Sequence, residues 1–445
     1  MRASLSLLTL AAALALVGCG SKAKLSVDAV TGPNPKLVEP KSSWFPTVEI
    51  AKAVGWAKGA APTPAPGLQV TEYAAGLSHP RWLYVLPNGD VLVAETDAPG
   101  RPGQQSGGLR SWIEGLVMKR AGARMPSANR ITLLRDANRD GVVDSRFTFL
   151  TGLNSPFGMA LHDGTLYVAD ADALIAFPYK DGDTRIGAKP RKIVDLPAGL
   201  NHHWTKNVVV RDSDGRLFVA VGSNSNVGEN GLDAEEGRAA IWEVMPDGRH
   251  NLYAYGLRNP VGMAFRPGTE ELFAVVQERD ELGSDLVPDY LTGVQPSGFY
   301  GWPFSYWGDN VDVRIEQNPK LVATALKPDY AMGPHVAVLG LTFAQGAKLG
   351  PRFANGAFVG EHGSWNRKPP SGYKVVFVPF TGAKPGPGKP IDVLTGFLDK
   401  AGDAQGRPVG VTIDKAGALL VADDVGNRVW RVTATEPAPA PVAMR

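Results

Sequence analysis

The chain has 445 residues, of which 52 are glycine and 36 are proline, a content that excludes a mainly helical protein. Hydrophobic residues make up 44% of the chain and supply a large core, so many short strands joined by turns are expected. The 46 lysines and arginines nearly balance the 44 aspartates and glutamates, which leaves no basic stripe for nucleic acid. Composition therefore favours an all-β fold with no nucleic-acid partner.

The first residues are typical of an exported lipoprotein. Arg2 precedes the apolar run Leu5–Val17, which is too short to span a bilayer as a helix but suits a secretory signal. Residues 16–19, Leu-Val-Gly-Cys, resemble a lipobox, in which the cysteine becomes the lipidated first residue of the mature protein. We therefore expect residues 1–18 to be a signal peptide and Cys19 to attach the protein to the membrane.

Cys19 is the only cysteine, so the chain has no internal disulfide, no cysteine-ligated metal site and no thiol nucleophile. The C-x-x-C-H motif of a covalently attached haem is also missing, so any electrons must pass to an external acceptor, a quinone or a cytochrome. Gly20 directly after the cysteine resembles sorting to the outer membrane. The expected location is the periplasmic face of that membrane.

Residues 19–66 are rich in lysine, alanine and proline and are expected to form a tether between the lipid and the folded body. Trp44, Phe45 and Trp56 are too apolar for a free linker, which indicates that part of this arm packs on the body. At the other end of the chain, residues 434–445 form a Pro/Ala-rich tail.

One pattern recurs six times between these segments: a polar residue, often before proline, then a short apolar run, a turn and a second apolar run. The copies open at His79, Ser155, Lys206, Asn259, Val338 and Arg407. Repeats of this size predict a six-bladed β-propeller over residues 67–433, with each blade a four-stranded sheet. The segment Gly67–Tyr73 is expected to close the ring as the outer strand of the last blade. A β-sandwich without repeats is the alternative.

In a propeller the innermost strand of each blade starts at the central channel, so the residues that open the repeats converge on one mouth. Two arginines, a lysine and a histidine among them suit a multiply anionic ligand, because guanidinium groups bind carboxylates in a bidentate manner. Alternatively, some of these residues cap strands or bridge blades. The predicted mouth residues are His79, Ser155, Lys206, Arg258, Asn259 and Arg407.

His203 lies three residues before the opening of the third repeat, in a turn that also holds His202 and Trp204. A histidine beside the mouth can abstract a hydroxyl proton at neutral pH, so we predict that His203 is a general base. A structural role is the alternative for a single histidine. His335 has the same offset in the fifth repeat and is the rival base.

Two loops concentrate oxygen ligands of the kind that Ca²⁺ prefers. The first, residues 277–285, concentrates carboxylates and turn carbonyls and is a candidate Ca²⁺ site, with a solvated acidic loop as the alternative. The second, Asp136–Asp144, matches the first half of a calcium loop, but Phe147 stands where the bidentate glutamate of such a loop is needed. This second loop lies between two strand-like runs and fits a hairpin tip better than a calcium site.

The loop 362–370 brings His362, Trp365 and Arg367 together just after the fifth repeat, and Tyr300-Gly-Trp-Pro and Tyr306-Trp add aromatic surface. Each of these is as compatible with a structural role as with a functional one. Dinucleotide-binding, P-loop and serine-hydrolase motifs are missing, so those functions lack their signatures.

Four motifs resemble the glucose/sorbosone dehydrogenase family of pyrroloquinoline quinone (PQQ) enzymes, in the order that family has them. They are His203-Trp-Thr-Lys-Asn, Tyr255-Gly-Leu-Arg-Asn-Pro-Val-Gly, Glu278-Arg-Asp-Glu-Leu-Gly and Tyr300-Gly-Trp-Pro. His362-Gly-Ser-Trp-Asn-Arg is more similar to the sorbosone dehydrogenase branch. The resemblance covers roughly residues 67–433.

The resemblance implies a six-bladed propeller, PQQ and a Ca²⁺ ion bound partly by backbone carbonyls of the loop 277–285. The matching metal positions are Asp280 and Glu281, with Asp285 nearby. It implies that His203 takes the substrate's hydroxyl proton while hydride passes to the quinone. Matching cofactor contacts are Arg258 and Asn259, followed by Arg407, Arg367 and Trp365, with Lys206 added from the mouth residues. His202 replaces an acidic residue of soluble glucose dehydrogenase, which argues against glucose as the substrate.

The expected function is therefore PQQ- and calcium-dependent oxidation of a sugar or sugar aldehyde of the sorbosone or aldose class. The alternative is a lipoprotein propeller that binds a ligand, or hydrolyses a lactone with a metal and without a quinone.

Overall fold

The computed structural model describes residues 21–41, 47–100, 122 and 126–435. Cys19, Trp44, Phe45 and the tail from residue 436 lie outside these ranges. Strands dominate the described part, and no helix there is long and apolar enough to cross a membrane.

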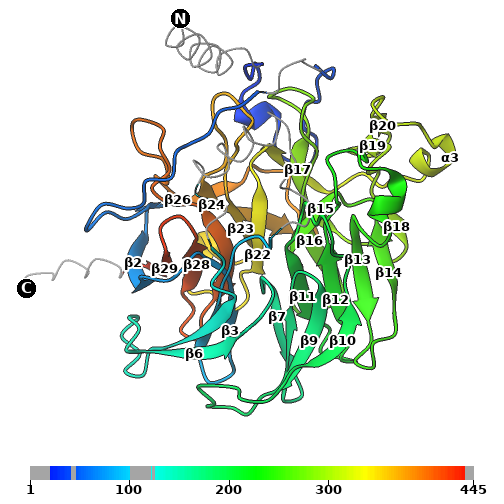
Figure 1. Cartoon of the computed structure of the whole chain (residues 1–445). Coiled ribbons are helices and arrows are strands. Elements are labelled where there is room, and N and C mark those ends of the chain that lie inside the picture. The colour runs from blue at the N-terminus through cyan, green and yellow to red at the C-terminus, as the bar shows by residue number, and fades with distance from the viewer. Residues whose placement is uncertain (1–20, 42–46, 101–121, 123–125, 436–445) are drawn as a thin grey trace, which may run out of the picture.

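Six sheets are arranged around one axis, which confirms the predicted six-bladed propeller and makes the β-sandwich alternative wrong (Figure 1). The first three blades are β3 (Pro80–Val85), β4 (Val91–Glu95), β5 (Arg130–Arg135) and β6 (Ser145–Thr151); β7 (Met159–His162), β8 (Thr165–Ala169), β9 (Ala173–Pro178) and β10 (Arg191–Asp195); and β11 (Lys206–Val210), β12 (Leu217–Val221), β13 (Ala240–Val244) and β14 (His250–Tyr255).

The fourth blade is β15 (Asn259–Phe265), β16 (Leu272–Gln277), β17 (Pro288–Gly293) and β21 (Tyr330–Pro334). The fifth is β22 (Val338–Phe343), β23 (Gly356–Glu361), β24 (Lys374–Thr381) and β26 (Ile391–Thr395), and the sixth is β27 (Pro408–Ile413), β28 (Leu419–Asp423), β29 (Arg428–Ala434) and β2 (Leu68–Ala75). Between β17 and β21 an insertion carries β18 (Gly298–Phe299), β19 (Ser305–Tyr306), β20 (Asn310–Val311) and the short helix α3 (Pro319–Val322).

Each predicted repeat supplies the two inner strands of one blade. The innermost strands β3, β7, β11, β15, β22 and β27 contact one another in a closed ring. The second strands of the blades, such as β12 and β28, are buried along their whole length because neighbouring blades cover both faces. Their sequences are therefore continuous apolar runs. A Cβ on Gly340 would lie 2.2 Å from the Val409 carbonyl oxygen, so the glycine of the repeat lets adjacent inner strands approach closely.

The ring is closed by pairing of the two ends of the propeller sequence, as predicted for Gly67–Tyr73. Strand β2 runs antiparallel to β29, from Leu68 opposite Ala434 to Ala75 opposite Arg428. Because these partners are far apart in sequence, the sixth blade forms only when both ends of the domain are present.

The described part of the N-terminal arm, residues 21–41 and 47–66, packs on the propeller. β1 (Thr63–Pro64) pairs with β26, and Gly32 pairs with Ala331. The Trp56 indole N–H donates to Asp423 at 2.6 Å, and its ring packs edge-on against Phe397 and Trp430. The prediction that part of the arm contacts the body holds for Trp56.

The loop Asp136–Asp144 joins β5 to β6 and is a hairpin tip. Its carboxylates accept hydrogen bonds from nearby backbone amides, including Gly141 N–H to Asp136 at 2.8 Å and Val142 N–H to Asp140 at 2.8 Å. Most of this loop is exposed at the end of the propeller opposite the starts of the inner strands.

We call the end where the inner strands start the mouth end. Antiparallel order places two kinds of connection there: those between second and third strands, and those from one blade to the next. The loops 222–239, 278–287 and 362–373, and the turn before β11, all belong to this end.

Candidate active site

The turn before β11 holds His203 at the mouth end with its imidazole in one tautomer. Its Nδ1 lies 2.8 Å from the Ser223 carbonyl oxygen and 3.0 Å from the Ser223 Oγ. A carbonyl can only accept, so Nδ1 carries the proton and Nε2 keeps its lone pair. Burial, and then the positive charge of Arg258, hold the pKa of His203 well below its usual value. The ring is therefore a neutral proton acceptor at neutral pH.

Gly222 allows this placement. A Cβ on Gly222 would lie 2.6 Å from the Cβ of His203 and 2.3 Å from the Asn259 Oδ1, so a larger residue would displace one of them. The exposed ring of His202 lies beside the base, with 5.1 Å between the two ring centroids.

Lys206 does not face the mouth, contrary to its prediction as a cofactor contact. Its side chain is fully buried, and Nζ donates to Asn201 Oδ1 at 3.0 Å and to the carbonyls of His203 and Trp204 at 3.4 Å. Burial, followed by nearby Arg238, holds the pKa of Lys206 well below its usual value. Its amino group supports the turn that carries His203 and is not accessible to a ligand.

Arg258 connects the turn that carries His203 to the loop 278–287, which we call the acidic loop. Its carbonyl accepts the N–H of Ser223 at 2.8 Å, and its guanidinium donates to the Glu278 carbonyl at 2.7 Å and to the Asp280 Oδ2 at 3.2 Å. It also donates to the carbonyl and side-chain oxygens of Asn226. Most of its hydrogen-bonding capacity is thus used within the protein. The buried Oδ1 of the neighbouring Asn259 has no hydrogen-bond partner among the described residues.

His335 is engaged at both ring nitrogens, which argues against it as the base. Nε2 lies 3.0 Å from the Gly283 carbonyl oxygen and Nδ1 lies 3.5 Å from the Asp280 Oδ1. Although burial opposes protonation, the hydrogen bond and charge of Asp280 raise the pKa of His335. In turn, Arg258 and His335 overcome burial and lower the pKa of Asp280 to about 2. The pair is an ion pair within the site wall.

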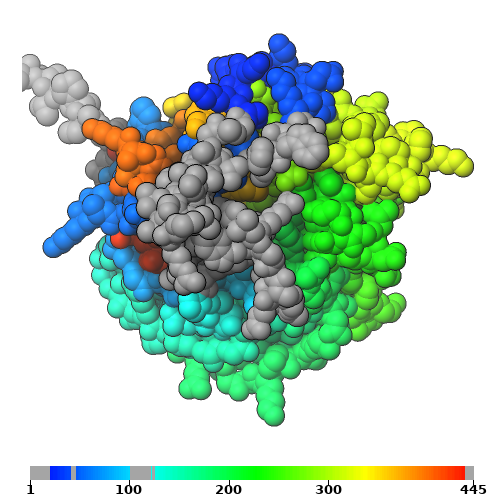
Figure 2. Space-filling view, turned by 45° about the horizontal axis from the view of Figure 1, so that its top comes forward, coloured from blue at the N-terminus to red at the C-terminus, as the bar shows by residue number. Residues whose placement is uncertain are grey.

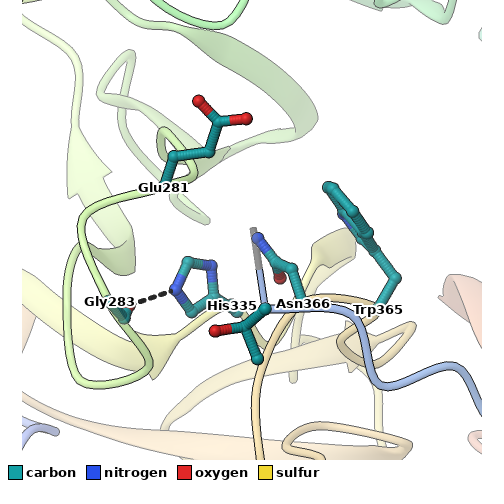
Figure 3. Close-up of a pocket in the computed structure, with 6 residues that line it drawn as sticks. Glu281, Gly283, His335, Trp365 and Asn366 are labelled. Atoms are coloured by element: carbon teal, nitrogen blue, oxygen red, sulfur yellow. Dashed lines mark hydrogen bonds between the residues drawn. The ribbon is translucent and has the colours of Figure 1, made fainter. Parts of the chain in front are cut away.

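A hollow at the mouth end lies between the acidic loop and the loop 362–373, and Figure 3 shows residues that line it. Glu281 comes from one side, and His335, Asn366 and Trp365 come from the other. Asn366 Nδ2 donates to the Asp280 Oδ1 at 2.6 Å, whereas Trp365 is 37% exposed and offers a flat apolar face. The hollow is lined by Thr47, Glu281, Gly283, His335, Trp365 and Asn366.

The three predicted metal carboxylates do not converge. Asp280 is bound to Asn366, His335 and Arg258, as described above. Asp285 accepts the backbone N–H of Lys24 at 2.6 Å, from the N-terminal arm. Only Glu281 of the three lines the hollow. Among residues 21–41, 47–100, 122 and 126–435, no three His, Cys, Asp or Glu side chains are placed to hold a metal ion.

Arg367 also differs from its prediction as a cofactor contact. It is 3% exposed and donates to the carbonyls of Ser284 and Pro369 at 2.9 and 2.8 Å, while Asp285 lies 3.9 Å away. Its guanidinium therefore joins the loop 362–370 to the acidic loop.

A second polar network, around Asp424, lies at the mouth end where the first, fifth and sixth blades meet. Asp424 Oδ2 accepts from Arg81 Nη1 at 2.6 Å and His362 Nε2 at 2.8 Å, and His79 Nε2 lies 3.6 Å away. Although burial opposes ionisation, these groups hold the pKa of Asp424 well below its usual value. Burial lowers the pKa of His362 to about 4, so this second imidazole is also neutral.

Arg407 is the buried guanidinium at the mouth with the weakest partners of those described. Its Nη atoms reach the carbonyls of Gly363 and Ala51 only at 3.5 and 3.4 Å, and its Nε has no hydrogen-bond partner in the described part of the chain. Its Cζ lies 4.8 Å from the centre of the Tyr373 ring. Arg407 thus keeps donor capacity for an anion.

Sequence reasoning missed Ser223, Arg81 and Asp424. The repeat marks only the position before Asp424, because the second strand of a repeat ends in Val-Ala followed by an acid at Glu95, Asp170 and Asp423. Arg81 comes directly after His79-Pro80, at the opening of the first repeat.

Comparison with known proteins adds family information to this geometry. A family model described as TrAA12-like matches residues 127–289 and 316–435. A PQQ-dependent pyranose dehydrogenase of Coprinopsis cinerea is 26% identical over 360 residues, which cover 66% of this chain and 48% of that protein. This chain therefore matches only about half of that relative's length.

Two solved structures share the fold. The holo PQQ domain of the Coprinopsis cinerea pyranose dehydrogenase superposes with a TM-score of 0.66 and 22% identity, covering 86% of this chain and 100% of that one. A calcium structure of the Trichoderma reesei family AA12 protein gives a TM-score of 0.67 with 18% identity, covering 87% and 99%. At these identities the likeness establishes the fold alone.

Proposed function

Because this chain belongs to the TrAA12-like family, we propose that it is a PQQ-dependent oxidoreductase that oxidises a sugar or sugar aldehyde of the sorbosone or aldose class. The observation that carries this proposal is the neutral His203 with its Nε2 lone pair available at the mouth end. The name of the Coprinopsis cinerea relative supports sugar oxidation with PQQ. Electrons pass to an external quinone or cytochrome.

His203 acts as the general base. Its Nε2 accepts the proton of the substrate hydroxyl as the carbon bearing that hydroxyl loses hydride, and Ser223 holds the ring in the required tautomer. The low pKa of His203 keeps it unprotonated before each turnover. PQQ, when bound, supplies the quinone that accepts the hydride. His202, exposed beside the base, is the residue that we expect to restrict which sugar binds.

The residues at the mouth fit a tricarboxylate such as PQQ. Arg407 has an unpartnered Nε, among the described residues, and Asn259 has a buried Oδ1 in the same condition. Arg407 would bind a carboxylate, Asn259 would accept a hydrogen bond, and Trp365 would contribute its exposed face. Arg258 would act mainly through its charge, since its donors are largely used.

The predicted carboxylate site for Ca²⁺ does not fit the described residues, because Asp280 and Asp285 face other partners. We therefore assign no step to calcium. A calcium requirement stays a prediction, with Glu281 the one predicted side chain still in the hollow.

Reconstitution tests the function. Purified protein is titrated with PQQ, with and without Ca²⁺, while quinone absorbance after dialysis and dye reduction with aldoses and sorbosone are measured. We expect retained PQQ and turnover of at least one sugar. Loss of all PQQ on dialysis together with no turnover would refute the enzyme assignment, and lactone hydrolysis without PQQ would favour the alternative of a metal-dependent lactonase.

Arg407→Gln tests the cofactor contact without relying on activity. PQQ binding measured by absorbance should weaken by at least about tenfold, since a charge-assisted hydrogen bond contributes about 1.5–3 kcal/mol. Arg367→Gln is the matched control, because Arg367 is equally buried but donates at 2.9 and 2.8 Å to the carbonyls of Ser284 and Pro369. Equal PQQ affinity in wild type and Arg407→Gln would remove Arg407 from the site.

We also propose that the protein is exported and attached by a lipid on Cys19 to the periplasmic face of the outer membrane. The support is the lipobox-like sequence at residues 16–19. Metabolic labelling with radioactive palmitate should mark the wild-type protein and not Cys19→Ser. Unlabelled wild-type protein would contradict the anchor.

A further inference from the structure

The N-terminal arm is bound to the acidic loop from its first described residue. Ser21 and Ser284 exchange hydrogen bonds, with Ser284 N–H donating to Ser21 Oγ at 2.9 Å and Ser284 Oγ donating to the Ser21 carbonyl. Next, Lys24 N–H donates to Asp285 at 2.6 Å, and Lys41 N–H donates to the Leu282 carbonyl at 3.0 Å. Asp285 is 7% exposed, so these bonds are shielded from water. We call the contacts of Ser21 and Lys24 with Ser284 and Asp285 the arm latch.

The N-terminal arm also contacts the loop 362–373 on the other side of the hollow. Ala23 N–H donates to the Lys368 carbonyl at 2.8 Å, and Glu49 N–H donates to the Trp365 carbonyl at 2.9 Å. The arm thus crosses the mouth end between both loops of the candidate site. In Figure 2 the dark-blue residues of the arm lie on the surface at this end.

The position of Ser21 limits how far from the mouth end a lipid on Cys19 can be attached. Cys19 is two residues before Ser21, and a chain reaches at most about 3.6 Å per residue, so the two residues are at most about 7 Å apart. The inner strands that separate the two ends of the propeller have four to seven residues, or about 13–23 Å. The lipid can therefore reach a bilayer easily only from the mouth end.

We propose that the mouth end of the propeller faces the membrane surface, with the lipid bilayer as its partner. This inference rests on the lipid anchor proposed above. An electron acceptor confined to the bilayer would then meet the site without having to pass around the propeller.

The distribution of exposed apolar and basic side chains agrees with this orientation. Leu200 and Leu232 are about half exposed on connections at the mouth end, and Trp365 is 37% exposed there. Val313 is 83% exposed. Its neighbours place it at the mouth end, because Asp312 accepts from Arg279 and the Arg314 guanidinium donates to the Asp280 carbonyl. Apolar side chains of this size favour the interfacial region of a bilayer.

Lysines next to the anchor add attraction to anionic lipids. Lys22 and Lys24 are both exposed on the latched part of the arm. A lysine close to an anionic membrane surface is attracted to it. At the opposite end the β5–β6 hairpin presents Val142 among the carboxylates of Asp136, Asp140 and Asp144, which an anionic surface repels.

Single-cysteine labels test the orientation directly, because Cys19 is the only native cysteine and is acylated in the lipidated protein. Leu232→Cys at the mouth end and Val142→Cys at the opposite end are matched, with 49% and 51% exposure in the wild type. Lipidated protein carrying a fluorophore at either site is placed on vesicles of phosphatidylethanolamine and phosphatidylglycerol that contain a nitroxide-labelled headgroup. Flotation of the vesicles reports the anchor separately.

We expect at least about twofold stronger quenching at residue 232 than at residue 142, because the ends are about 13–23 Å apart. The double variant Ser284→Ala/Asp285→Asn should still float but show a quenching ratio closer to one. Equal or reversed quenching on floated vesicles would overturn the orientation. Failure to float would remove the anchor and the orientation with it, while dye reduction by the same preparation reports the oxidoreductase function independently.

Discussion

His203 and His335 have the same offset in two repeats, yet the structure places their imidazoles in opposite chemical states. Burial, and then the positive charge of Arg258, lower the pKa of His203, and its Nδ1–H donates to a carbonyl, so Nε2 keeps its lone pair. The ring of His335 lies between a carbonyl and the carboxylate of Asp280, so its pKa rises and both nitrogens are occupied. The sign of the neighbouring charge, rather than the position in the repeat, decides which histidine can accept a proton.

His362 shows that a neighbouring carboxylate does not by itself keep an imidazole protonated. It too contacts an aspartate, but its burial, and then the positive charges of Arg407 and Arg81, keep its pKa at about 4. A carboxylate shared with an arginine therefore orients an imidazole without charging it.

Replacing the proposed base should have the largest effect. In His203→Ala the rate of dye reduction should fall by at least about 10²-fold, the low end for a general base, while PQQ affinity is unchanged. Stopped-flow reduction and PQQ titration measure the two quantities. A loss of less than about threefold would show that His203 is not the base.

The pH dependence should follow the low pKa of His203. Because its folded pKa is depressed, the base stays neutral until the pH falls well below the usual value of about 6.5, and the rate then drops about tenfold per pH unit. Turnover measured across mildly acidic pH reports this limb. A midpoint at or above about 6.5 would contradict the depressed pKa.

Lys206→Met separates the two roles considered for Lys206. If Lys206 supports the turn, the rate constant should fall by roughly tenfold through loss of its hydrogen bonds to the turn, with PQQ affinity unchanged. Absorbance titration provides the affinity. Weakened PQQ binding at a normal rate constant would restore the original prediction of a cofactor contact.

His335→Gln should have the smallest effect on chemistry. Glutamine can still donate to the Gly283 carbonyl, so we expect a rate change below about threefold and a loss of stability of about 1–3 kcal/mol from the broken pair with Asp280. Thermal unfolding and dye reduction measure both. A rate loss as large as that of His203→Ala would mean that the base is misassigned.

Local sequence signals were sufficient for the architecture. Five of the six repeat openings lie at, or one residue before, the start of an inner strand, and Ser155 lies four residues before β7. The two ends of the propeller sequence pair as predicted. The resemblance to PQQ-dependent sugar dehydrogenases is confirmed at the level of the family, whereas the sorbosone branch stays a prediction. These features depend on short-range alternation of apolar runs, turns and glycines, which the chain carries in every copy.

Side-chain direction was beyond the reach of the repeat pattern. Lys206 opens its blade like Arg407, but it turns inward to three carbonyl and amide oxygens while Arg407 keeps an unpartnered Nε among the described residues. Asp285 belongs to the acidic loop, which the sequence predicts to be a metal site. Its carboxylate instead accepts a hydrogen bond from Lys24 of the N-terminal arm, more than 250 positions away. Nothing near Asp285 in the sequence encodes that partner.

The sequence by itself determined the propeller, the number of blades, the mouth end and the position of His203, because each follows from periodic local patterns. Only the tertiary structure decided which carboxylates meet cations, which histidine stays neutral and where the arm lies. Those properties depend on the charge and hydrogen-bonding partners that ring closure brings together, such as Asp424 with Arg81 and Ser21 with Ser284.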